Sequence, residues 1–98
     1  MKEDQLNIDE TSLSVDLIDA TQAVKESRFE DALNLLSVVL KENPDHIDSL
    51  YLAAVSTRYL KKFNDSKKYI ENLLFNAPDM GRAYQELGHL NRDKIGRA

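Results

Sequence analysis

The side chains that most often carry out chemistry are sparse in this chain of 98 residues. Cysteine is absent, which excludes thiol chemistry, and the only histidines are His46 and His89. Neither histidine lies in a recognisable nucleophile motif, and two distant histidines without cysteine lack the ligand spacing of a metal site. His46 follows Asp45 at an expected helix start, where we expect a surface position. The sequence therefore predicts no catalytic residue, no metal site and no cofactor.

The remaining candidate groups have structural explanations. Glu30 and Asp31 form a carboxylate pair, but they begin an expected helix, where the helix dipole favours negative charge. The glycines at 81, 88 and 96 do not have the spacing of a phosphate-binding loop. We therefore expect this chain not to be an enzyme.

Composition and charge are those of a small soluble domain. Hydrophobic residues make up 42% of the chain and charged residues 31%, as is usual for globular proteins. The formal net charge is −4, and no basic patch suited to nucleic acid or to a membrane surface is evident. The sequence has no membrane-spanning run and no signal peptide. We expect a cytoplasmic protein with an acidic flexible tail over residues 1–12 and a single domain over residues 13–98.

A period in the sequence indicates how the chain is organised. Pro44 and Pro78, its only prolines, lie 34 residues apart. When the sequence is compared with itself at this offset, residue size is kept at most positions. The matched pairs include Phe29 with Phe63, Ala32 with Ser66, Leu36 with Ile70, Leu40 with Leu74, and Leu50 with Tyr84. Such a period is typical of stacked helical units.

Apolar residues within each unit recur every three to four positions, which predicts amphipathic helices. We expect helices over residues 13–26, 29–42, 46–61, 64–76 and 80–94, and no strand. Pro44 and Pro78 should end the second helix of each unit, because proline disfavours helical geometry in the residue before it. Asp45 and Asn64 are the expected N-caps of the helices that follow them.

Small residues at one phase of successive first helices should allow close packing. Ala20, Ala54 and Gly88 are related by the 34-residue period. Two helices approach to about 8–10 Å only where the contact residues permit it. We expect these three residues to be close-approach points, with Ala32 and Ser66 opposite them on the second helices.

The matched residues resemble the tetratricopeptide repeat, whose unit is a helix–turn–helix of the same length. The resemblance gives repeats over residues 13–46 and 47–80 and a partial repeat over 81–98. It implies an all-α, tandem helix-turn-helix solenoid of about five helices. It also implies a scaffold that binds a protein or peptide, not nucleic acid or membrane, through the concave face of its first helices.

The resemblance further implies which residues face this groove. Leu17, Thr21 and Asp48 are among them, together with an aromatic and cationic strip of residues that are frequent in binding hot spots. The candidate partner-binding residues are Tyr51, Arg58, Tyr59, Arg82, Gln85, His89 and Arg92. The alternative is that the two tyrosines only cover the helix pair and that the arginines are solvated.

One known binding mode of the family is excluded by the residues themselves. Some relatives grip a peptide's terminal carboxylate with lysine, asparagine and arginine side chains. The corresponding positions here hold Leu17, Thr21, Leu52, Arg82 and Glu86. Only Arg82 suits a carboxylate, and Glu86 would repel one.

Two further expectations remain open. The sequence is also similar to the N-terminal repeats of bacterial proteins that join tetratricopeptide repeats to a sulfotransferase, which would make this chain an accessory domain of a larger enzyme. In addition, Leu87, Leu90 and Ile95 should lie uncovered on an unpaired last helix and favour a homo-oligomer. On the second helices, we expect the side chains of Leu35, Val38, Tyr69 and Phe75 to point outward.

Overall fold

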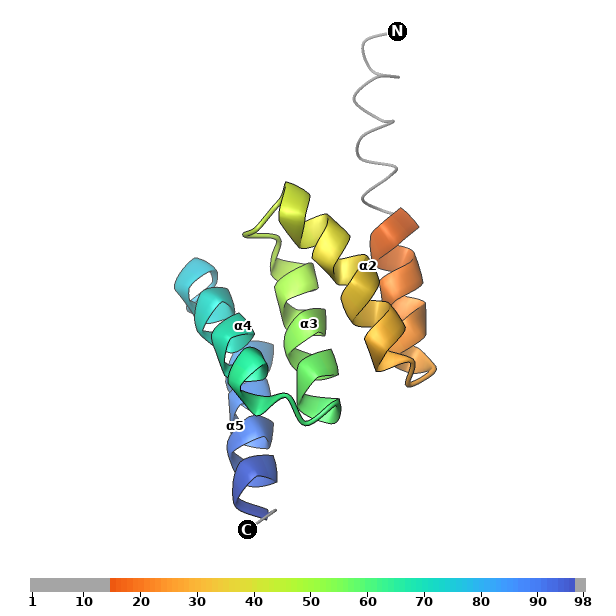
Figure 1. Ribbon diagram of the computed structural model, residues 1–98. Helices are drawn as coiled ribbons and strands as arrows, with labels where there is room; N and C mark the ends of the chain where they lie inside the picture. Colours follow the sequence, from red (N-terminus) through yellow and green to blue (C-terminus); the bar gives the residue numbers. More distant parts are fainter. Residues whose placement is uncertain (1–14, 97–98) are drawn as a thin grey trace, which may run out of the picture.

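A computed structural model describes residues 15–96, and over this span the protein is helical throughout, without a strand (Figure 1). A helix over residues 15–25 is followed by α2 (Phe29–Glu42), α3 (Ile47–Tyr59), α4 (Phe63–Asn76) and α5 (Gly81–Gly96). The predicted all-α tandem of helix pairs is confirmed. Where the structure describes both ends, the helix boundaries differ from the predicted ones by at most two residues. The predicted acidic tail lies outside the described residues.

The 34-residue period is present in the backbone. Helices α2 and α4 are each 14 residues long and begin at Phe29 and Phe63. The turns before them are closed by equivalent hydrogen bonds, in which the Arg28 amide donates to Ala23 (2.7 Å) and the Lys62 amide to Thr57 (2.8 Å). Each turn contains one residue with a left-handed backbone, Ser27 with φ 61° and Lys61 with φ 65°. The two units are therefore alike in local geometry as well as in residue size.

Helix α3 lies at the centre of the core, between α2 and α4 (Figure 1). Ala53 packs with Ala20, Ala23, Ala32 and Leu36, which joins α3 to the first helix and α2. On its other side, α3 contributes Leu50 and Ala54 to clusters that also contain residues of α4 and α5. Because α3 buries apolar residues in two directions, it connects the two halves of the structure.

Four of the five residues predicted at close contacts between helices are buried, as expected. Ala54 and Ser66 are fully buried, and the Ser66 hydroxyl donates to the Ala54 carbonyl over 2.9 Å. Ala20 and Ala32 are buried at the equivalent place in the first unit. The prediction for Gly88 is wrong, because its Cα is exposed and a Cβ there would meet nothing within 4 Å. Among the described residues, no second helix packs against this face of α5.

The residues that cap the starts of α3 and α4 differ from the expected ones. His46 is the N-cap of α3, and its Nδ1 accepts from the Ser49 amide over 3.3 Å, so Asp45 does not cap this helix. His46 itself is half-buried. Helix α4 starts at Phe63 with Lys62 as an N-cap that makes no side-chain hydrogen bond, which places Asn64 inside the helix. At the start of α4, a backbone turn closed by its own hydrogen bonds takes the place of a side-chain cap.

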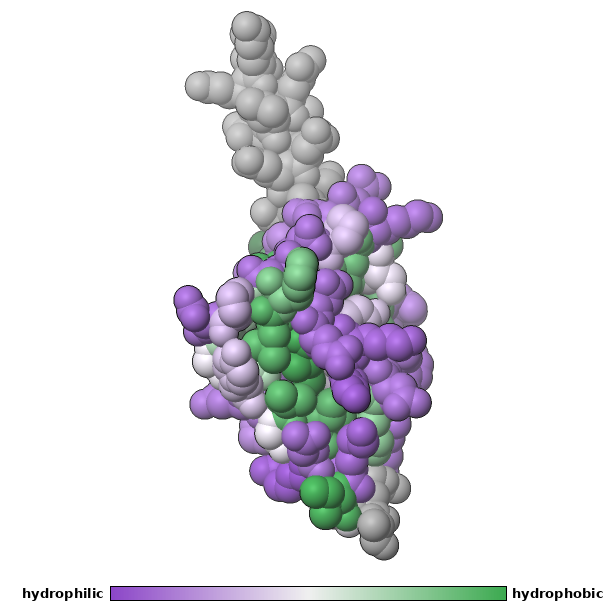
Figure 2. Space-filling view, turned by 90° about the vertical axis from the view of Figure 1, so that its left-hand side faces the viewer, coloured by the Kyte–Doolittle hydropathy of each residue, from purple (hydrophilic) through white to green (hydrophobic). Residues whose placement is uncertain are grey.

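The face formed by α4 and α5 carries a band of apolar surface (Figure 2). Phe75 and Ile95 are the most exposed large apolar residues of these helices. The prediction that Leu90 is uncovered is wrong, since it is buried against Ala54 and Ile70. Leu35 and Tyr69, expected to point outward, are half-buried and pack against the core clusters. The exposed apolar area is thus smaller than the sequence predicts.

Replacing Ala54 with leucine should destabilise the fold by about 1–3 kcal/mol, because the larger side chain overpacks the contact with Ser66. The matched control is Gly88→Leu at the equivalent position of α5, where there is open space. That change should stabilise the helix by about 0.8 kcal/mol through helix propensity. Urea unfolding followed by circular dichroism measures both, and equal effects of the two leucines would contradict the assigned contact.

Replacing Ser27 with glycine should stabilise the protein by about 0.5–1 kcal/mol, because glycine adopts the left-handed backbone at this turn without steric cost. The control is Ser37→Gly, an exposed site within α2. Glycine there should cost about 0.5 kcal/mol through lower helix propensity. Thermal melts of the two variants should therefore shift in opposite directions, and a loss of stability in both would refute the expectation.

Candidate functional site

A hollow of about 320 Å³ joins the first helices of the successive units, and we call it the first hollow. Leu17 and Thr21 come from the helix over 15–25, and Arg82 comes from α5. Helix α3 contributes Asp48, Tyr51 and Leu52. Five of these six residues were expected to face the groove, Leu52 being the exception. The structure therefore brings together residues from three separate helices that the repeat pattern had assigned to one face.

Arg82 and Tyr51 form the polar side of the first hollow. The guanidinium carbon of Arg82 lies 4.6 Å from the centre of the Tyr51 ring, a cation–π distance. The Arg82 guanidinium also lies 3.9 Å from the Asp48 carboxylate. All three side chains remain accessible, so these contacts orient the arginine without contributing much stability. The result is a positioned cation beside an accessible aromatic ring.

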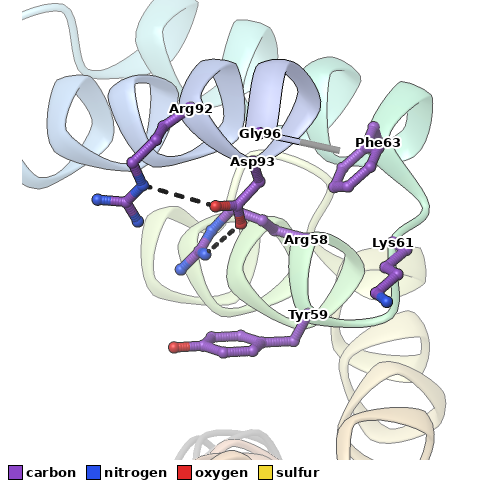
Figure 3. Close-up of a pocket in the computed structure, with 7 residues that line it drawn as sticks. All are labelled: Arg58, Tyr59, Lys61, Phe63, Arg92, Asp93 and Gly96. Atoms are coloured by element: carbon purple, nitrogen blue, oxygen red, sulfur yellow. Dashed lines mark hydrogen bonds and ion pairs between the residues drawn. The ribbon is translucent and has the colours of Figure 1, made fainter. Parts of the chain in front are cut away.

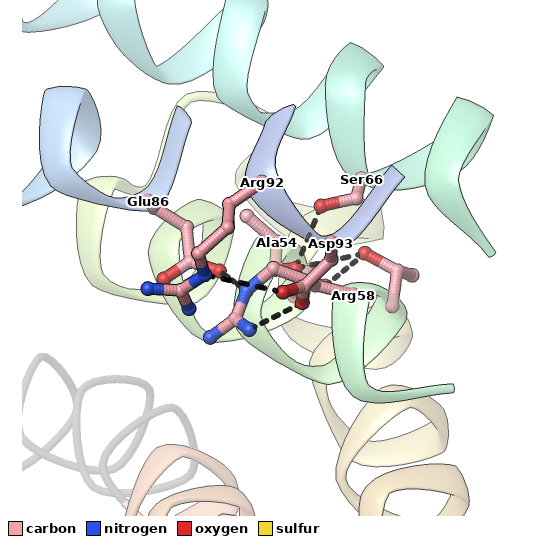
Figure 4. A network of polar contacts seen from close by, with 8 residues as sticks. Ala54, Arg58, Ser66, Glu86, Arg92 and Asp93 are labelled. Atoms are coloured by element: carbon pink, nitrogen blue, oxygen red, sulfur yellow. Dashed lines mark hydrogen bonds and ion pairs between the residues drawn. The ribbon is translucent and has the colours of Figure 1, made fainter. Parts of the chain in front are cut away.

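Arg58 occupies a different environment from the one expected. Only 9% of its side chain is exposed, and it forms ion pairs with Glu86, which is also buried, and with Asp93 at 2.8 Å (Figure 4). The two carboxylates belong to α5, so Arg58 ties α3 to α5. Neither expectation from the sequence describes it, because this arginine is not solvated and its Nε and Nη1 groups donate to Glu86 and Asp93.

The charge states follow from these contacts. Burial lowers the pKa of Arg58, but its hydrogen bonds to Glu86 and Asp93 outweigh that effect, so the pKa lies above the ordinary value for arginine. The hydrogen bond from Arg58 is the main cause that lowers the pKa of Asp93 below its usual value of 3.8. The Arg58–Asp93 pair is therefore ionised at neutral pH.

The other candidate residues are spread along the same face. Tyr59 stacks parallel to Phe29 with ring centres 4.7 Å apart, while the Arg58 guanidinium carbon lies 4.6 Å from the same ring. Gln85 is exposed and His89 is half-buried, and neither lines the first hollow. Arg92 is exposed and approaches Asp93 at 3.7 Å. The seven candidate residues thus do not form one continuous site.

Sequence reasoning missed Glu86 and Asp93 as partners of Arg58. The available signal is their spacing of seven residues, which places both carboxylates on one side of α5 two turns apart. The spacing does not reveal that Arg58, near the C-terminal end of α3, lies opposite these two carboxylates. This information depends on how α5 packs against α3.

The described part of the chain offers no arrangement for metal chemistry. Residues 15–96 contain no group of three or more His, Asp or Glu side chains placed to hold a metal ion. Within the same span, no helix combines the length and the apolar character needed to cross a bilayer.

Comparisons with known proteins add no assignment. No protein-family model matches the sequence, and a search of curated proteins finds no similar one. The resemblance to the tetratricopeptide repeat therefore stays a prediction from the residues. Any function has to be argued from the geometry of the groove.

Replacing Arg58 with methionine should cost about 3–5 kcal/mol, because Glu86 then remains buried without a partner. The double variant Arg58→Met/Glu86→Leu should recover most of this loss, since two apolar side chains can replace a buried ion pair. Urea unfolding of both variants, beside the single Glu86→Leu variant, measures the coupling. Additive losses in the double variant would contradict the assigned pair.

Proposed function

We propose that this chain is a non-catalytic interaction module that binds an extended protein or peptide segment along the groove between the first helix, α3 and α5. The observation that supports this proposal is the first hollow, to which all three helices contribute side chains. Stacked helical units typically use the surface formed by their first helices for binding.

The chemistry of the lining suits a peptide side chain. Leu17 and Leu52 supply apolar surface, and Tyr51 supplies a rigid aromatic ring. The Thr21 hydroxyl already donates to the Leu17 carbonyl over 2.7 Å, so it presents mainly its methyl group and its oxygen lone pairs. A volume of about 320 Å³ is at the lower end of the range for ligand sites. The hollow is therefore large enough for one or two side chains.

Resemblance to the tetratricopeptide repeat points to the same class of function. An accessory role beside a sulfotransferase would use the same groove to position a substrate protein. We take binding of a peptide segment as the activity that both roles share.

The proposal can be tested with a random peptide library displayed on phage and selected against the purified chain. A selected peptide should bind at least tenfold more weakly to Tyr51→Ala, because the ring that forms the side of the hollow and supports Arg82 is removed. Fluorescence anisotropy of the labelled peptide gives both dissociation constants.

The matched control is Tyr84→Ala, since Tyr84 is an exposed tyrosine of α5 that does not line the first hollow. This variant should keep wild-type affinity. Amide chemical shifts should also change around Thr21 and Leu52 when the peptide is added. Failure of the library to yield any binder, or equal losses in the two tyrosine variants, would refute the proposed groove.

A further inference from the structure

The first hollow carries two opposite charges close to each other. Nη2 of Arg82 lies 3.9 Å from Oδ1 of Asp48, and both residues line the hollow. A hydrogen bond between nitrogen and oxygen normally spans about 2.7–3.2 Å, so the pair is in ionic contact without a direct hydrogen bond. The two side chains are 58% and 61% exposed, respectively. The donors of Arg82 and the acceptors of Asp48 are therefore accessible to a bound segment.

A larger hollow, of about 400 Å³, also contains opposite charges, on Arg58, Lys61, Arg92 and Asp93. There the Lys61 ammonium and the Arg92 guanidinium lie on opposite sides and point apart (Figure 3). The Asp93 carboxylate accepts a hydrogen bond from Arg58 over 2.8 Å. Of these two hollows, the first is therefore the one in which an accessible donor and an accessible acceptor lie together.

Tyr51 orients the donor of this pair. The guanidinium carbon of Arg82 lies 4.6 Å from the centre of the Tyr51 ring. Tyr51 follows Asp48 by three residues in α3, a spacing that places two side chains on the same side of a helix. A guanidinium has five N–H donors in one plane, so contact with the ring leaves donors at its edge free. The first hollow thus combines an oriented donor from α5 with a carboxylate acceptor from α3.

The formal charges of the lining cancel, because Asp48 and Arg82 are the charged members among the six lining residues. A carboxylate in the ligand is attracted by Arg82 and repelled by Asp48, and an ammonium meets the reverse. A neutral group that donates and accepts at once avoids both repulsions. The side-chain amide of glutamine or asparagine is such a group, with a carbonyl oxygen that accepts and an NH₂ that donates.

The remaining lining suits the rest of such a side chain. Leu17, Leu52 and the Tyr51 ring supply apolar surface, against which the methylene stem below the amide can pack. A single peptide bond in the ligand is a poorer match, because its C=O and N–H point to opposite sides in the trans form. The lining therefore favours a side-chain amide over the amide of one peptide bond.

We propose that the first hollow recognises the side-chain amide of a glutamine or asparagine in the bound segment. The amide oxygen accepts a hydrogen bond from the Arg82 guanidinium, and the amide NH₂ donates to the Asp48 carboxylate. This inference rests on the proposed function and names the type of residue that the groove selects.

Peptides selected from the phage library should be enriched in Gln or Asn at one fixed place. Replacing that residue with the corresponding acid, Glu or Asp, should weaken binding about fivefold, because the carboxylate then faces Asp48. An apolar residue of similar shape, Met or Leu, should weaken binding by a similar factor, since both hydrogen bonds are lost. Fluorescence anisotropy of the labelled peptides measures these differences, and equal affinities of the three peptides would overturn the inference.

The variant Asp48→Asn tests the acceptor. With the carboxylate gone, an acidic residue in the peptide is no longer repelled, so the preference for the amide over the acid should fall about fivefold. The control is Glu71→Gln, which changes the net charge equally at an exposed position of α4 that does not line the first hollow. It should leave the preference unchanged, and an equal fall in both variants would overturn the inference, because net charge alone would then explain it.

Further outcomes separate this inference from the proposed function. Selected peptides that need Tyr51 for binding but show no preference for Gln or Asn would overturn the amide site and leave the groove intact. Tolerance of Met at the selected place, together with loss of binding when a backbone nitrogen of the peptide is methylated, would assign the contact to the main chain and also overturn the inference. A library without any binder would refute both proposals together.

Discussion

The contact between Ala54 and Ser66 sets the distance between α3 and α4, and most of the structure depends on that distance. With a methyl group on one side and a hydroxyl on the other, the helices approach closely enough for Ser66 to donate to the Ala54 carbonyl. Ala20 and Ala32 are buried at the equivalent place of the first unit. Small side chains at these positions allow Leu36 and Ile70 to be fully buried in the neighbouring clusters. The helices are thus regularly spaced. The faces of the first helix, α3 and α5 that line the first hollow lie on the same side of the stack.

This regular spacing explains why so much of the fold follows from the sequence. Residue size, proline position and apolar phase are local properties, and they recur with the period of the unit. The helix ends were also predictable, because Pro44 and Pro78 follow the ends of α2 and α4 and equivalent turns recur in the two units. The caps were less predictable, since several polar residues compete at a helix start, and His46, not the expected Asp45, caps α3 by accepting from the Ser49 amide. The prediction for Gly88 was wrong because the period placed Gly88 on the equivalent face of its helix, but no described helix lies opposite that face.

The groove was predictable only in part, for a related reason. Repeat phase identifies which side of a helix a residue faces, and this was sufficient to group Leu17, Thr21 and Tyr51. It does not tell how deeply a long side chain extends between two helices. Arg58 has the phase of a groove residue, yet its guanidinium turns toward Glu86 and Asp93 on α5. An ion pair between two helices depends on how the helices pack against each other. The residue pattern of one helix carries no information about that packing.

Helix α5 contributes Arg82 to the first hollow, and within the described residues it packs only against α4 and α3. Its link to α3 combines two buried apolar clusters, in which Ala83 and Leu90 lie with Leu50 and Ala54, with the ionic bridge through Arg58. A segment that contacts α3 and α5 together can bind only the docked arrangement, and its binding free energy is therefore added to the stability of that arrangement. A segment bound along the proposed groove would in this way be thermodynamically coupled to the docking of the last helix.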